Sequence, residues 1–124
     1  MRTWIAVAAL FGLAAVALGA FGAHGLKSRA SAEQLAWLET ATRYAMWHAL
    51  ALLGVAALGE TAAGAAAGTL RWVAWSFAIG IVVFSGSLTL MALGGPRWLG
   101  ATTPFGGGAF LFGWASLVVY ALWR

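Results

Sequence analysis

Few side chains in this sequence could do chemistry, and three of them lie on one short stretch. Glu39 and Arg43 are four residues apart, and His48 follows shortly after them. On a helix, four-residue spacing places two side chains on one face, so Glu39 and Arg43 are expected to form an ion pair. The pair has two interpretations: a structural contact near lipid headgroups, or a charged pair in a polar cavity or conduction path.

His48 points to a different side of the same expected helix. At 100° per residue, His48 lies about 180° from Glu39, so one continuous helix cannot bring both to one site. Thr40, Tyr44 and His48 instead form a second stripe. The spacing therefore argues against a combined glutamate and histidine centre.

The remaining histidine, His24, closes the first apolar stretch and is expected to be a hydrogen-bonded cap or, alternatively, a catalytic base. Metal sites need several ligands at suitable spacing, and no short-range ligand pair occurs here. The chain also has no cysteine, which excludes disulfides and thiolate ligands. We predict no metal and no cofactor.

Hydroxyl groups within apolar stretches are expected to be structural. Ser85 and Ser87 lack the strand-turn-helix setting of a nucleophile elbow, and a helical serine usually bonds to a carbonyl or to another helix. The run of glycines at 106–108 has no following lysine, so it does not match a phosphate-binding loop. Close backbone packing is the better interpretation of these glycines.

The composition indicates where these groups are held. The chain is 63% hydrophobic and only 8% charged, with a mean hydropathy of +0.90. A soluble domain is about a quarter charged, so lipid must be much of the solvent here. The basic residues lie singly or in pairs at the ends of apolar runs, which is typical of headgroup contacts and excludes a clustered nucleic-acid-binding face.

We predict a single all-α domain, residues 1–124, that forms a transmembrane bundle of four helices. A spanning helix needs about 20 apolar residues. The first stretch is longer than the apolar region of a signal peptide, so we expect a retained helix. The expected spans are 4–23, 44–59 as part of a helix over 32–58, 72–94 and 104–123.

Local signals set the expected helix ends. Ser31 and Gln34 form a capping-box pattern ahead of the second helix, which either runs unbroken or breaks near Tyr44 into an amphipathic helix and a tilted span. Residues 60–68 are expected to be a short connection, and 94–96 end the third helix. Thr103 is expected to cap the fourth helix, with Pro104 at its first position.

Small residues four apart are expected to let these helices approach closely, since packing rather than hydrophobicity drives association in lipid. An even number of spans places both termini on one side, and the basic residues leave the orientation open. Tryptophans near helix ends are typical of an aromatic belt. The spaced small residues are Ala8/Gly12, Ala15/Gly19/Ala23, Ser76/Gly80 and Ala109/Gly113.

Five segments in the same order resemble the domain of unknown function 423 family, which includes bacterial small membrane proteins and the eukaryotic transmembrane protein 256. They are 19–26, 39–44, 48–51, 84–88 and 103–107. The resemblance implies a small multi-helix protein of the bacterial cytoplasmic membrane without an assigned activity. A basic tail, frequent in the family, would favour cytoplasmic termini; this chain has only Arg124 there. The matching positions are His24, Glu39, Arg43, Tyr44, His48, Ser85, Ser87, Thr103 and Pro104.

Three functional hypotheses follow. The first is a non-enzymatic protein that acts through helix packing, as a homo-oligomer or as an accessory subunit of a membrane complex. The second is a small-solute or proton pathway that uses Glu39, Arg43 and His24. The third is a lipid-modifying enzyme with His24 or His48 as general base.

Overall fold

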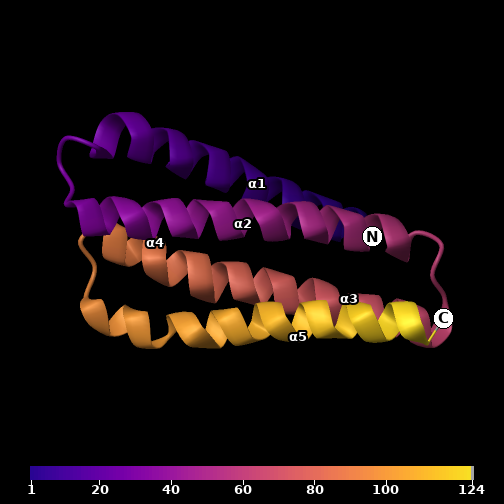
Figure 1. The fold of residues 1–124 in the computed structure, drawn as a ribbon. Helices are drawn as coiled ribbons and strands as arrows, with labels where there is room; N and C mark the ends of the chain where they lie inside the picture. The colour runs from indigo at the N-terminus through magenta and orange to yellow at the C-terminus, as the bar shows by residue number, and fades with distance from the viewer. Residues whose placement is uncertain (124) are drawn as a thin grey trace.

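The computed structural model describes residues 1–123, and every regular element in that range is helical (Figure 1). Three elements with other hydrogen-bond patterns, η1 to η3, extend or join the α-helices. In chain order the elements are α1 (Arg2–Phe21), η1 (Gly22–Leu26), α2 (Ala32–Gly59), α3 (Gly64–Gly80), η2 (Ile81–Ser85), α4 (Gly86–Ala92), η3 (Arg97–Ala101) and α5 (Thr103–Leu122).

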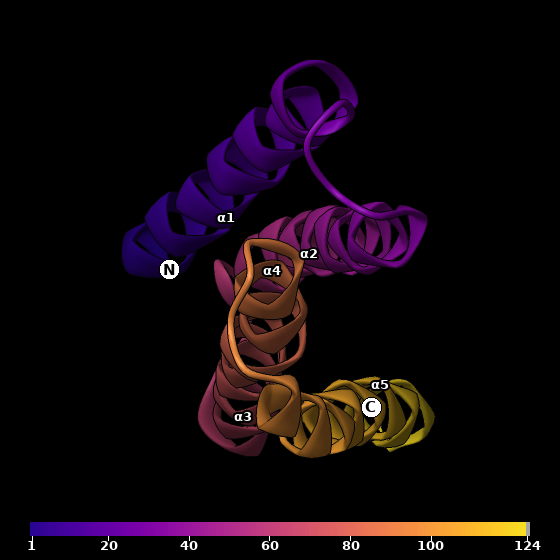
Figure 2. The ribbon, with the colours of Figure 1, turned by 90° about the vertical axis from the view of Figure 1, so that its left-hand side faces the viewer.

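These elements form four long helical rods: α1 with η1, α2 alone, α3 with η2 and α4, and η3 with α5. The rods pack side by side in an open row (Figure 2). α1 packs on α2, α2 packs on the rod made by α3, η2 and α4, and that rod packs on α5. α1 and α5 lie at opposite ends of the row, so it does not close into the compact bundle that we expected. Three rods are long and apolar enough to cross a membrane: Arg2–Leu26, Gly64–Ala92 and Arg97–Leu122.

The second rod, α2, is one unbroken helix of 28 residues. The Ser31 hydroxyl accepts a hydrogen bond from the Gln34 backbone N–H, and the Gln34 side chain accepts one from the Ser31 backbone N–H. This confirms the capping box, which pairs two of the otherwise unpaired donors at the helix start. The alternative of a break near Tyr44 was wrong.

The third rod begins earlier than expected and contains a wide turn. α3 starts at Gly64, so most of the predicted 60–68 connection is helix. Gly64 has a φ of +59°, a conformation that glycine adopts without strain and that sets the entry angle of this helix. Ile81–Ser85 forms a π-helical turn, and Gly94, with a φ of +99°, follows the end of α4 as the glycine signal predicted.

The start of the fourth rod differs by one residue from the prediction. A 3₁₀ turn over Arg97–Ala101 precedes α5, and Thr102 rather than Thr103 occupies the cap position. Pro104 is in the first turn, as proline tolerates. Neither threonine caps the helix with its side chain: the Thr102 hydroxyl donates to the Leu99 carbonyl, and the Thr103 hydroxyl contacts Ser87, as described below.

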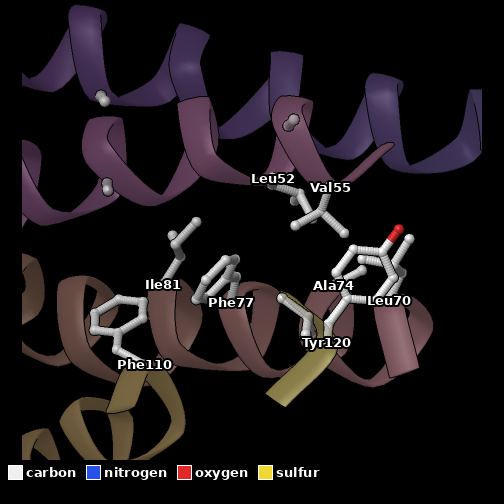
Figure 3. Close-up of a cluster of buried hydrophobic side chains, with 12 residues drawn as sticks. Leu52, Val55, Leu70, Ala74, Phe77, Ile81, Phe110 and Tyr120 are labelled. Carbon is white, nitrogen blue, oxygen red and sulfur yellow. The ribbon is translucent and has the colours of Figure 1, made fainter. Parts of the chain in front are cut away.

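A buried apolar cluster includes residues of all four rods, and its large side chains come from α2, the third rod and α5 (Figure 3). Phe77 of α3 lies at its centre and has no exposed surface. Leu52 and Val55 reach it from α2, and Phe110 and Tyr120 reach it from α5. The three rods that carry the candidate functional residues are therefore fixed to one another by this cluster.

Some of the predicted small residues lie in contacts between helices, and others do not. Ala8 and Ala15 are buried in α1, and a Cβ added at Gly80 or Gly113 would meet the ring of Phe110 or Phe77 within 2.4–2.5 Å. A Cβ at Gly12, in contrast, would meet nothing within 4 Å. Small residues therefore permit the contact of α3 with α5, whereas Gly12 is outside the packed interface.

Candidate functional site

His48 is the best-connected polar side chain inside the fold. It is only 5% exposed, and both of its ring nitrogens have partners. Nδ1 lies 2.7 Å from the backbone oxygen of Tyr44, one turn earlier on α2. Nε2 lies 3.0 Å from Nε1 of Trp114, which comes from α5.

These partners define the protonation of the ring. The indole N–H of Trp114 is only a donor, so Nε2 of His48 must accept and cannot carry a proton. The Tyr44 carbonyl is only an acceptor, so Nδ1 carries the proton and donates it. His48 is therefore a neutral imidazole with no nitrogen left to act as a general base, which argues against the enzymatic hypothesis at this residue.

Aromatic rings enclose the imidazole on the remaining sides. Phe110 stacks on it, with ring centroids 3.6 Å apart and planes 13° apart, and Phe77 makes a T-shaped contact with a centroid distance of 5.4 Å. We call His48, Tyr44, Phe77, Phe110 and Trp114 the His48 cluster. It connects α2 directly to α5 across the third rod, and its chemistry is that of a structural hydrogen bond.

The His48–Trp114 bond predicts a measurable coupling. His48→Leu, Trp114→Phe and the double variant should unfold with non-additive free energies, because each single change leaves one buried partner unpaired. Hydrogen bonds between membrane helices average roughly 0.6 kcal/mol and reach about 1.7 kcal/mol, so we expect a coupling of about 1 kcal/mol. Unfolding in mixed detergent micelles with increasing dodecyl sulfate measures each free energy.

A parallel cycle of His48→Leu with Trp98→Phe is the control, because the Trp98 side chain is 67% exposed and belongs to η3. That cycle should be additive. If the His48–Trp114 cycle were additive within about 0.3 kcal/mol, the bond would contribute nothing to stability.

A second polar contact holds the start of α5. The Ser87 and Thr103 hydroxyls lie 2.6 Å apart, and Ser87 also donates to the Phe84 carbonyl at 3.0 Å. The Thr103 hydroxyl also lies 3.4 Å from the Leu99 carbonyl, so either hydroxyl can donate the bond between Ser87 and Thr103. The expected serine role, a bond to a carbonyl and across to another helix, is confirmed at Ser87.

Ser85 differs from the other helical serines. Ser76 and Ser116 each donate to the carbonyl four residues earlier, as serines in helices commonly do. The Ser85 hydroxyl is buried without a hydrogen-bond partner among residues 1–123. Ser85 lies in the π-helical turn, where the Ile81 carbonyl four residues earlier already accepts from the Gly86 N–H.

Glu39 and Arg43 form the predicted ion pair, but the pair is on the surface. Their side chains are 59% and 62% exposed, so the contact is the structural interpretation rather than a buried charged pair. A second exposed pair joins Arg97 to Glu33. His24 is exposed in η1 and has no hydrogen bond within the described chain.

The predicted site residues therefore do not form one centre. Tyr44 and His48 lie in the His48 cluster, Ser87 bonds to Thr103, and Glu39 with Arg43 faces outward. No group of three potential metal ligands occurs in the described part of the chain. Trp114 and Phe110, which complete the His48 cluster, were absent from the prediction, and no local sequence signal pairs them with His48.

Three hollows accompany these residues. An apolar groove of about 720 Å³ lies between α1, α2 and the η2–α4 part of the third rod, and a polar pocket of about 360 Å³ lies between the end of the first rod and α2. An aromatic groove of about 740 Å³ lies beside the His48 cluster, between α2 and α5. The apolar groove is lined by residues that include Phe11, Leu18, Thr42, Ser85, Gly86 and Trp98. The polar pocket is lined by residues that include Gly19, Lys27, Glu39 and Thr42. The aromatic groove is lined by residues that include Trp47, Phe84 and Leu111.

Fold, surface and site together define a class: a small helical integral membrane protein whose internal polar contacts are structural. The surface supports this, because large apolar side chains such as Leu10, Leu13 and Leu122 are more than 60% exposed. So many exposed apolar side chains would be unfavourable in water, whereas the hydrocarbon of a membrane solvates them.

The comparisons place the chain within this class. Residues 18–107 match the family described as protein of unknown function DUF423, and the chain belongs to that family. A UPF0382 membrane protein of Staphylococcus saprophyticus is 44% identical over 96% of both chains. UPF0382 membrane protein YwdK of Bacillus subtilis is 41% identical over 98% of both chains.

The inner membrane protein YgdD of Escherichia coli is 40% identical over 98% of this chain and 90% of YgdD. No solved structure matches this chain. The resemblance to the family is thus confirmed, and the chain is an integral protein of the cytoplasmic membrane without an assigned activity.

Proposed function

We propose that this protein crosses the membrane four times and acts by packing against other membrane helices, as a homo-oligomer or as an accessory subunit. The supporting observation is how its polar groups are used. Both nitrogens of His48 and the hydroxyls of Ser87 and Thr103 are bound within the fold, and Glu39 is paired with Arg43. Few groups remain for catalysis.

The fourth crossing follows from the position of α2. At 1.5 Å per residue its 28 residues extend about 42 Å, more than the roughly 30 Å hydrocarbon thickness. α2 lies along its length between α1 and the third rod, which are both apolar enough to cross (Figure 1). A helix that packs along two crossing rods is positioned to cross with them, which supports a fourth crossing with the charged first turns of α2 at the headgroups.

Both chain ends then lie on the same side of the membrane, since they are at the same end of the rods (Figure 1). Trp4 is in the first turn of α1 and Trp123 directly follows α5, so both are beside the chain ends, as an aromatic belt requires. The four-crossing arrangement therefore agrees with the tryptophan placement.

The open row of the four rods supports the proposed association with other membrane helices. Only 17% of the most apolar window of the first rod and 22% of that of the last rod are buried, compared with 56% for the third. The two outer rods thus present apolar faces over most of their length. Helices in lipid associate through such faces when close packing is available.

Native mass measurement of the full chain in lipid nanodiscs tests this proposal. We expect a dimer or larger assembly, or a stoichiometric complex with another membrane protein extracted alongside it. Because the chain has no cysteine, single-cysteine variants at outer-rod positions report the contact. Leu13→Cys in α1 or Leu111→Cys in α5 should crosslink with a short bismaleimide.

Leu50→Cys in α2 is the matched control, because Leu50 is also exposed but lies on an inner rod. A strictly monomeric protein without a co-purified partner, and without crosslinks at either outer rod, would contradict the proposal.

A further inference from the structure

We propose that the apolar groove and the polar pocket form one binding site for an anionic glycerophospholipid, with an acyl chain in the groove and the phosphate near Lys27. The two hollows are adjacent at Thr42, which lines both. On the first rod their linings are also consecutive, since Leu18 lines the groove and Gly19 lines the pocket. The combined site is therefore apolar in the groove and carries Lys27, Glu39 and Thr42 among the residues of the pocket.

The dimensions correspond to one lipid leaflet. From Phe11 in the groove to Lys27 beside the pocket is about 24 Å of chain at the helical rise per residue. Half of a bilayer, hydrocarbon and headgroups together, is about 20–22 Å. The groove volume of about 720 Å³ is also within the range of pockets that hold small molecules.

The groove is open sideways to the membrane. Val82, Leu90 and Trp98 line it and are each more than half exposed, so a chain can enter from the surrounding lipid without opening the fold. Gly86 lines the same groove, and a Cβ built there meets nothing within 4 Å. The groove therefore has unfilled space beside Gly86.

Ser85 adds an independent observation. Its hydroxyl is the buried one without a partner among the described residues, and Ser85 lines the groove. It lies about 10 Å along the helix from Ala92, the last residue of α4; with that helix end at the headgroups, Ser85 is near the depth of the glycerol esters. A rotation about its Cα–Cβ bond would offer the hydroxyl to an ester oxygen of the occupant.

The charge at the polar end selects an anionic headgroup. Glu39 lines the pocket but is paired with Arg43, and Glu33 is paired with Arg97. Lys27 also lines the pocket and has no ion pair within residues 1–123.

Native mass spectrometry of the full chain, after equilibration with nanodiscs of dioleoyl phosphatidylglycerol or dioleoyl phosphatidylcholine, tests the proposal. We expect one retained phosphatidylglycerol per chain and about fivefold less retained phosphatidylcholine, because a surface cation favours an anionic lipid by about that factor. Equal retention of the two lipids would overturn the proposal.

Two matched pairs of variants locate the lipid. Gly86→Leu should fill the groove and lower retention of phosphatidylglycerol by about tenfold or more, whereas Gly54→Leu should not. Both glycines are helical with open space at the Cβ, but only Gly86 lines the groove. Lys27→Gln should lower retention about fivefold, whereas Arg29→Gln, outside the pocket lining, should change it little.

An unchanged lipid adduct in Gly86→Leu would contradict the proposal. So would loss of a protein dimer in Gly86→Leu with no lipid adduct in the parent, because the groove would then hold a second copy. The lipid adduct and the protein mass are separate readouts, so this inference can fail while the proposed association through the outer rods stands.

Discussion

Phe77→Ala is expected to lower the free energy of unfolding by about 3–5 kcal/mol, the largest effect of any single change considered. Phe77 has no exposed surface and lies at the centre of the apolar cluster. Its ring contacts the edge of His48 and lies 5.1 Å from the Trp114 ring. Removing it leaves a cavity and also removes the support for the His48–Trp114 hydrogen bond.

Dodecyl sulfate unfolding of the two proteins in the same micelles measures this difference. Phe105→Ala is the control, because Phe105 is in the first turn of α5 and is 78% exposed. Its removal should change the free energy by less than about 0.5 kcal/mol. Similar losses for Phe77→Ala and Phe105→Ala would mean that burial in this fold does not determine stability.

The helices could be predicted because their signals are local. Ser31 and Gln34 are three residues apart and set the start of α2 through their own hydrogen bonds. Gly94 ends the third rod through its backbone conformation alone. A local signal depends only on neighbouring residues, so it can be recognised before any tertiary contact is known.

The candidate site was less predictable, because its contacts join residues far apart in the chain. Position on a helix correctly separated Glu39 from His48, since that requires only the angle per residue. Nothing in the sequence connects His48 with Trp114, 66 residues later, because the pairing depends on how three rods pack. The structural role of His48 therefore emerges only from the fold.

The open row of rods and the π-helical turn at Ile81–Ser85 could not be predicted from the sequence either. Apolar stretches in lipid are uniform enough that several packing orders satisfy the same composition. The wide turn at Ile81–Ser85 has no sequence signature, yet it leaves the Ser85 hydroxyl without its usual carbonyl. π-helical turns frequently occur at functional sites, which agrees with the proposed lipid groove at this turn.

Gly106→Ala is the second change with a large expected effect, a loss of up to about 3 kcal/mol in the free energy of unfolding. A Cβ at Gly106 would lie 2.4 Å from the backbone nitrogen of Phe84 and 2.8 Å from its Cα. Those atoms belong to the backbone of η2, which cannot rotate away as a side chain can. α5 must therefore separate from the third rod, weakening the Ser87–Thr103 contact and the stack of Phe110 on His48.

Gly108→Ala separates this steric effect from the general preference of helices for alanine. Gly108 is in the same helix, and a Cβ there meets nothing within 4 Å. Alanine is favoured over glycine in a helix by up to about 1 kcal/mol, so Gly108→Ala should be neutral or slightly stabilising. The two variants are thus expected to differ clearly in their effect on stability, although the substitution is the same. Equal unfolding free energies for both would show that α5 does not approach η2 as closely as Gly106 indicates. The expected difference would establish that approach, which the Ser87–Thr103 bond and the aromatic contacts to His48 all require.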